Sequence, residues 1–230
     1  MSVGNGCDPL ATRMGVRILR WPDLLVVEAP VPLAVASTAV LGGGMVSARR
    51  IVSVRVPRGY TGTDPAADIR RAAHARGWTA DVGLMTAVPL DRTCLGGASA
   101  EGVTATAVVS AGLRQPWAAG SRRGPVLGAG TINVIVLLDG GLEPAAALNL
   151  LVTVTEAKVL TLLEAGLRTH DGEPASGTAT DAVVVASPLR GPGRRWRYGG
   201  PATPPGWAAA AATRQALRQA LEIARNGGNG

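Results

Sequence analysis

Residues 130–167 contain a strand pattern followed by the longest helix pattern of the chain. The first part, residues 130–139, reads GTINVIVLLD, and the apolar run after Asn133, stopped by Gly140-Gly141, predicts a buried strand. Residues 141–167 read GLEPAAALNLLVTVTEAKVLTLLEAGL, an almost wholly apolar segment that predicts a long buried helix beginning at Glu143-Pro144. Residues 182–186 predict a second buried strand. A buried helix between two strands is therefore expected at the centre of the molecule.

The flanking sequence adds more strands and two further helices. Strand-like runs occupy residues 16–19, 24–28, 33–41, 51–56, 82–88 and 103–110. Asp64-Pro65 predicts a helix start, Gly77 its end, and residues 207–225 predict a final helix. Groups of strands separated by single helices predict an α+β fold, a layered single domain of mixed or antiparallel sheet covered by helices over residues 16–226. Residues 1–15 and 227–230 are expected to be flexible ends. A doubly wound α/β sheet is the alternative, but strict strand–helix alternation is missing.

Three polar clusters interrupt this apolar sequence, at residues 130–133, 155–158 and 176–181. Lys158 in the second cluster is the only lysine among 23 basic residues. Arginine is a permanently charged fork, whereas a lysine is a compact point charge whose pKa moves on burial. The retention of one lysine beside a carboxylate predicts a built site.

Two interpretations fit the charged pair on the long helix. Its strongest apolar stripe is expected to face the core and consists of Leu148, Leu151, Val152, Thr155, Val159, Leu162 and Leu163. Glu156 and Lys158 fall on opposite edges of this stripe, so each is expected to meet a partner from another segment. In one interpretation they are edge charges with satisfied hydrogen bonds. In the other, Glu156 is a partly desolvated carboxylate that acts as a general base or as an acceptor that orients an amide, and Lys158 steadies it or stabilises an oxyanion.

Three further positions are candidates for the same site. Asn133 begins a buried strand, so its amide either holds a neighbouring loop or lines a pocket. Asp181 enters the next strand after a run of small hydroxyl residues, where it is either a turn cap or a site residue. Ser37-Thr38, followed by Gly43-Gly44, places hydroxyls and permissive backbone at a strand end, where a ligand can approach closely.

Composition and motifs exclude several classes of protein. The net charge is +7 and the pI about 10.8, but the arginines are scattered and no aromatic-rich basic motif is present, so nucleic acid is not the expected partner. Cys7 and Cys94 lie far apart, no secretory signal or spanning segment is recognised, and a cytoplasmic protein with no membrane partner is expected. His74 and His170 have no metal-ligand spacing, and neither a P-loop nor a Gly-x-Ser-x-Gly elbow occurs, so no metal is expected.

Read in order, the polar clusters and several other segments resemble the adenosylcobinamide amidohydrolase family of corrinoid salvage. The similarity covers most of the chain, from about residue 37 to the final helix. The segments that carry it are Ser37–Gly44, Val56-Pro57 with Tyr60, Gly62, Asp64 and Pro65, Val82–Ala87, Gly102–Ala105, Val109–Gly112, Gly130–Asn133, Thr153–Lys158 and Thr178–Ala182.

The resemblance implies hydrolysis of the amide that joins the aminopropanol arm to the corrin ring of adenosylcobinamide, giving adenosylcobyric acid and aminopropanol. An unactivated amide needs an activated nucleophile and a stabilised oxyanion. The implied catalytic residues are Glu156 as base and Lys158 and Asn133 at the carbonyl. Asp181 or Thr203 is expected to position the arm, and Ser37 or Thr38 is a candidate nucleophile. Substrate binding is expected at Ser37, Thr38, Gly43, Gly44, Thr131, Thr178, Thr180 and Thr203. The cobalt corrinoid is then substrate, no cofactor is needed, and a homo-oligomer is compatible with this interpretation.

The chain departs from the family pattern at two positions. Ala179 stands where relatives often carry a glycine, in Gly177–Asp181, and Ala202 stands where many carry a histidine before Thr203. A histidine general base is therefore not available at that position. These departures keep open a corrinoid-binding protein without catalysis, while the charge alone keeps open a nucleic-acid-binding protein, whose affinity would fall steeply with salt.

Overall fold

The computed structural model describes residues 14–121, 130–189 and 195–226 of the chain. Cys7 and the two expected flexible ends, apart from residues 14–15, lie outside these ranges. The strands are β1 (Arg17–Arg20), β2 (Leu24–Ser37), β3 (Gly44–Arg55), β4 (Val82–Thr86), β5 (Cys94–Ala100), β6 (Val103–Gly112), β7 (Pro116–Trp117), β8 (Thr131–Leu138), β9 (Gly177–Thr178) and β10 (Ala182–Pro188). The helices are α1 (Pro65–His74), α2 (Pro144–Glu164) and α3 (Pro204–Asn226), with a 3-10 turn at Leu90–Arg92.

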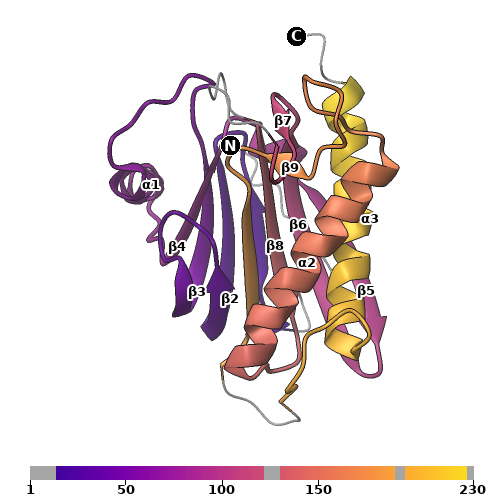
Figure 1. The fold of residues 1–230 in the computed structure, drawn as a ribbon. Coiled ribbons are helices and arrows are strands. Elements are labelled where there is room, and N and C mark those ends of the chain that lie inside the picture. Colours follow the sequence, from indigo (N-terminus) through magenta and orange to yellow (C-terminus); the bar gives the residue numbers. More distant parts are fainter. Residues whose placement is uncertain (1–13, 122–129, 190–194, 227–230) are drawn as a thin grey trace.

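One large mixed sheet dominates the fold. Its order is β4-β3-β2-β10-β8-β6-β5, with β1 added beside β2. The pairs β8–β10 and β3–β4 are parallel, and the other neighbours are antiparallel. With helices packed on the sheet, the α+β class predicted from the sequence is confirmed (Figure 1).

The sheet folds over on itself, which brings β4 to β8. These strands are separated by three others in the sheet, so in a flat sheet they would lie about 19 Å apart. Instead the Asn133 side chain of β8 donates a hydrogen bond to Met85 O of β4 at 2.8 Å. The bend occurs in β2, whose register with β3 shifts between Glu28 and Leu33. Pro30 and Pro32 lie in that interval and have no N–H to donate to a ladder.

Three apolar cores fill the resulting layers. The first lies between α2, α3 and one face of β6, β8 and β10, and includes Val134, Leu150 and Leu217. The second lies inside the folded sheet and includes Ile135 and Leu84. The third lies beneath α1, which stands apart from α2 and α3 beyond β4 (Figure 1).

Several elements differ from the prediction. Residues 24–28 and 33–41 were expected as two strands but belong largely to the single bent strand β2. Strand β5 was not predicted, because Gly96 and Gly97 weaken its strand pattern. A Cβ at Gly96 would lie 2.3 Å from Ala212 O, so a glycine is needed for α3 to approach this closely.

The predicted buried stripe of α2 is wrong. Leu148 and Val152 are each 51% exposed, and Leu163 is exposed as well. The helix instead buries a face of smaller residues together with leucines, namely Ala146, Ala147, Leu150, Thr153, Val154, Ala157, Lys158, Thr161 and Leu162. Periodicity could not identify this face, because α2 is apolar on both sides. By length and composition α2 could also cross a membrane, but half of its apolar window is buried in the core.

Candidate active site

A cavity of about 630 Å³ opens between the two halves of the folded sheet. Its walls come from segments far apart in the sequence, which the fold of the sheet brings together. They are residues 38 and 40 after β2, residues 56–61 and 65 between β3 and α1, residues 84–87 of β4 and beyond, residues 131 and 133 of β8, and residues 180–182 at the start of β10.

Asn133 presents an unpaired acceptor at this cavity. The residue is 4% exposed and lies on the inner face of β8. Its Nδ2 donates to Met85 O, whereas its Oδ1 is buried and has no hydrogen-bond partner. Buried polar atoms are rarely left unpaired, and because Asn133 lines the cavity, this oxygen is the candidate acceptor for a bound ligand.

The carboxylate of Asp181 holds the end of the sheet together. Oδ1 accepts from the backbone N–H of Ile132 at 2.9 Å, and Oδ2 accepts from Lys158 Nζ at 2.5 Å and from the backbone N–H of Thr178 at 3.1 Å. The Thr178 hydroxyl lies between Asp181 Oδ1 and Gly130 O. These contacts occupy the lone pairs of both carboxylate oxygens, so the structural role of Asp181 is to hold neighbouring groups in place.

Lys158 lies behind the cavity, on the buried face of α2. Its side chain is 8% exposed and that of its partner Asp181 11%, so the two form a buried ion pair. A Cβ at residue 177 would lie 2.4 Å from Asp181 Oδ2 and 2.8 Å from Lys158 Nζ, which explains the glycine there. The expectation that Lys158 meets a partner from another segment is confirmed, and that partner is Asp181.

Hydroxyl groups line the cavity beside this ion pair. Thr131 and Thr180 pair through their Oγ1 atoms at 2.6 Å, and Thr180 Oγ1 also lies 2.9 Å from Gly130 O. Thr38 Oγ1 accepts from the backbone N–H of Val183 at 3.0 Å, and its own proton has no acceptor among the described residues. Ser37 is buried outside the cavity wall, where its Oγ accepts from the backbone N–H of Ala39.

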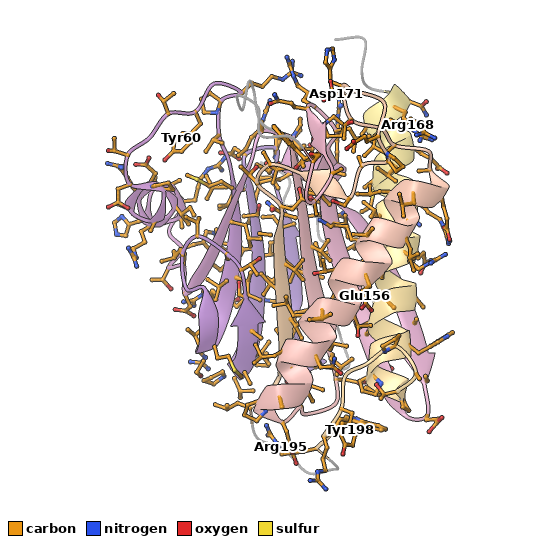
Figure 2. The ribbon with its side chains drawn as sticks, in the orientation of Figure 1. Tyr60, Glu156, Arg168, Asp171, Arg195 and Tyr198 are labelled. Atoms are coloured by element: carbon orange, nitrogen blue, oxygen red, sulfur yellow. The ribbon has the colours of Figure 1, made fainter. Side chains whose placement is uncertain are left out.

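Seven of the twelve expected site residues do not line this cavity. Three of them, Ser37, Lys158 and Thr178, are described above, and the other four lie further away. Glu156 is exposed on the outward face of α2, so the expectation of a desolvated base is wrong (Figure 2). Gly43 and Gly44 are exposed in the turn between β2 and β3, outside the cavity wall. Thr203 precedes α3, where its Oγ1 donates to Gly200 O and accepts from the backbone N–H of Gly206, so it caps a helix.

The two departures from the family pattern do not disturb the cavity. Ala179 is exposed and its φ is not positive, so the loop needs no glycine at this position. Ala202 is exposed beside Thr203 and does not line the cavity. A histidine at residue 202 would therefore not belong to the cavity wall.

The loop between β3 and α1 supplies site residues that were not predicted, notably Arg58 and Tyr60. Tyr60 OH donates to Asp68 Oδ2 at 2.5 Å, and this hydrogen bond raises the pKa of Tyr60 to about 12. Arg71 pairs with the same Asp68 carboxylate, and the two contacts, Tyr60 first, lower the Asp68 pKa. The sequence did offer an indication of these residues. The segment from Val56 to Pro65 contributes to the family resemblance, but none of its residues was assigned to the site from the sequence.

The cavity therefore combines a buried amide acceptor, a free hydroxyl and a hydroxyl pair on a rigid sheet end. Within the described ranges, no group of three or more His, Cys, Asp or Glu side chains could hold a metal ion. This set of polar groups matches a ligand that carries both an N–H donor and a carbonyl group.

The comparisons identify the family. The family model described as adenosylcobinamide amidohydrolase matches residues 9–228, and the chain belongs to this family. An adenosylcobinamide amidohydrolase of Methanosarcina mazei is 34% identical over 147 residues, which cover 64% of this chain and 66% of that protein. One from Halobacterium salinarum is 40% identical over 93 residues, covering 40% of this chain and 36% of that protein. The matched segments thus span less than two thirds of each relative.

Solved structures show weaker likeness. A beta-aminopeptidase of Burkholderia sp. superposes with a TM-score of 0.49 at 15% identity, covering 88% of this chain and 79% of that one. The l-aminopeptidase d-ala-esterase/amidase from Ochrobactrum anthropi gives a TM-score of 0.44 at 13% identity, covering 91% of this chain and 83% of that one.

Proposed function

We propose that this protein hydrolyses the amide between the aminopropanol arm and the corrin ring of adenosylcobinamide. Water is consumed, the C–N bond breaks, and the products are adenosylcobyric acid and aminopropanol, which corrinoid salvage returns to cobalamin synthesis. Membership of the family and the names of two relatives support this substrate.

The observation that carries the proposal is the unpaired Oδ1 of Asn133 in the cavity wall. The scissile amide of cobinamide offers one N–H, and a buried carbonyl-type oxygen is the complementary acceptor. Asn133 thus orients the amide through its N–H, rather than polarising its carbonyl as the sequence led us to expect. An amide held by its nitrogen presents a defined face to a nucleophile.

Thr38 is the candidate nucleophile. Thr38 and Asn133 flank β10 on opposite sides, beside Val183 and Ala182 respectively, and both residues line the cavity. Thr38 Oγ1 bonds to the carbonyl carbon, its proton passes to the departing aminopropanol nitrogen, and water then hydrolyses the ester to release the carboxylate.

Asp181 and Lys158 position these groups. Asp181 holds the backbone just before Asn133 through the N–H of Ile132, and the backbone just before Thr180 through the N–H of Thr178. Lys158 neutralises that carboxylate from behind the cavity wall. Substrate contacts are assigned to Thr38, Thr131, Asn133 and Thr180, which all line the cavity.

The size of the cavity determines which part of the substrate enters. A volume of about 630 Å³ suits a drug-sized ligand, whereas a corrin ring with its adenosyl group is larger. The aminopropanol arm therefore enters the cavity, and the ring lies at the mouth, beside the exposed residues Arg58 and Gly59.

The test is incubation of EDTA-treated protein with adenosylcobinamide in the dark, followed by mass analysis of the corrinoid. We expect adenosylcobyric acid from the wild type, a loss of more than about 10³-fold in Thr38→Ala, and measurable turnover in Ser37→Ala. If the corrinoid binds but stays intact, the protein is a corrinoid-binding protein without catalysis. If Thr38→Ala turns over normally, water and not Thr38 is the nucleophile.

A further inference from the structure

Helix α2 has a second apolar face that nothing in the described chain covers. Among the large hydrophobic side chains that the described residues expose, four lie on this one helix: Leu148, Val152, Leu160 and Leu163. The only charged residue among them is Glu156, which Figure 2 shows on the outward face of α2. Soluble monomers rarely expose a contiguous apolar patch of this kind, and such patches mark interaction sites.

The neighbouring helix shows what a solvated face looks like in this protein. Helix α3 packs beside α2 in the same layer and presents Arg218, Glu222 and Arg225 to solvent (Figure 1). Arg214 and Arg218 of α3 also reach Glu164 at the end of α2. Helix α3 also exposes Trp207 and Ile223, but charged residues separate them, whereas the exposed leucines and valine of α2 are interrupted by one charged residue alone, Glu156.

Three of these exposed side chains, with exposed Glu156 and the half-buried Thr155 and Val159 beside them, repeat symmetrically about the midpoint between Thr155 and Glu156. Each of the following pairs is equidistant from that midpoint: Leu148 and Leu163, Val152 and Val159, and Thr155 and Glu156. At 100° per residue, all six fall within about 50° of one line along the helix. A two-fold axis through that midpoint would place leucine on leucine and valine on valine.

We propose that α2 is the interface of a two-fold symmetric dimer, in which it packs antiparallel against α2 of a second copy. Leu148 then lies against Leu163 of the partner subunit, and Val152 against the partner's Val159. The two surfaces of a two-fold interface must be self-complementary. This face meets that requirement, because its symmetric pairs join leucine with leucine and valine with valine. Antiparallel pairing also brings the end of α2 that carries Glu143 toward the end that precedes Arg168, so the charges at the two ends are complementary.

The proposal places two like charges near the axis. Each Glu156 lies opposite Thr155 of the partner subunit, with the partner's own Glu156 near it across helices roughly 8–10 Å apart. Two ionised carboxylates at such a distance repel each other. The dimer is therefore expected to tighten in Glu156→Gln, by roughly fivefold in its dissociation constant at low salt.

The first test is the mass of the protein in solution, measured by sedimentation velocity over a range of concentrations. We expect twice the 23.3 kDa mass of one chain for the wild type, and a single-chain mass for Val152→Arg. The matched control is Val31→Arg, because Val31 is an equally exposed valine that lies on β2 and not on α2, and this variant should stay dimeric. Far-UV circular dichroism of each variant verifies its fold.

The second test is cross-linking in a Cys7→Ser background, with Cys94 left in place because it is buried. Residues 148 and 163 of one helix are about 22 Å apart, so antiparallel pairing predicts a disulfide only between Leu148→Cys and Leu163→Cys chains that have been mixed. A single-chain mass for the wild type would overturn the proposal. A dimer that persists in Val152→Arg and forms no mixed disulfide would also overturn it, because the interface would then lie elsewhere. A single chain that cosediments with lipid vesicles would overturn it too, because the face would then bind a membrane.

Discussion

Lys158 shows how far a single residue can be interpreted. As the only lysine in an arginine-rich chain, it was singled out from the sequence. Its structural role, a buried ion pair with Asp181, can be recognised only from the structure. Both side chains of the Lys158–Asp181 pair are almost wholly buried, and Asp181 is bonded to two backbone N–H groups as well. The sequence could not supply this partner, because Asp181 is brought to α2 only by the packing of β10.

Removing the lysine should destabilise the protein. Lys158→Ala leaves the Asp181 carboxylate buried without its counter-charge, which costs about 3–5 kcal/mol of unfolding free energy. Urea unfolding followed by circular dichroism measures this loss. The matched control is Arg76→Ala, which breaks the exposed pair between Arg76 and Asp23 and should change the unfolding midpoint little. Equal losses in the two variants would show that the Lys158 pair has no special role.

Tyr60 should titrate later than an ordinary phenol. Its hydrogen bond to Asp68 raises its pKa from 10.0 to about 12, so the folded protein holds this proton more tightly than the unfolded chain. The stabilisation is complete below pH 10 and is lost as the pH rises toward 12. Absorbance titration of tyrosinate in the wild type and in Tyr60→Phe isolates the residue. A Tyr60 transition at pH 10 would contradict the Tyr60–Asp68 contact.

At the level of helices and strands, the sequence predicted correctly those features that depend on residues close together in the chain. Asp64 caps α1 by accepting from the backbone N–H of Ala67, and the buried strand after Asn133 forms as expected. The buried face of α2 was predicted wrongly, because periodicity cannot rank two apolar faces. The neighbours of Asn133 could not be predicted, since Met85 reaches it only when the sheet folds.

Which face of α2 is buried can be tested by truncating two leucines that are two residues apart, Leu148 and Leu150. Leu150 is fully buried, so Leu150→Ala should cost about 2–5 kcal/mol of unfolding free energy. Leu148 is half exposed, and Leu148→Ala should cost much less in the monomer. The free energies of unfolding of the two variants are compared by chemical unfolding, at protein concentrations low enough to keep both monomeric. The opposite ranking would restore the stripe that the sequence favoured.

At the scale of the whole molecule, the folding of the sheet creates the site. Asn133 lies on β8, Thr38 directly follows β2 and Asp181 directly precedes β10, and the loop carrying Tyr60 reaches the cavity because β4 contacts β8. The sequence predicted the residues on β8 and β10, since the polar clusters mark them, but it did not predict the opposite wall. The net charge of +7 has no explanation in a substrate arm without phosphate.

The measurement that most directly tests the central claim compares kcat/KM for adenosylcobinamide hydrolysis in three proteins, the wild type, Asn133→Ala and Asn226→Ala. Asn226 is exposed at the end of α3, so its variant makes the same chemical change away from the cavity. We predict that Asn133→Ala loses about a hundredfold or more, because the amide is no longer oriented, and that Asn226→Ala matches the wild type. Equal rates in all three proteins would contradict the assignment of this cavity as the active site.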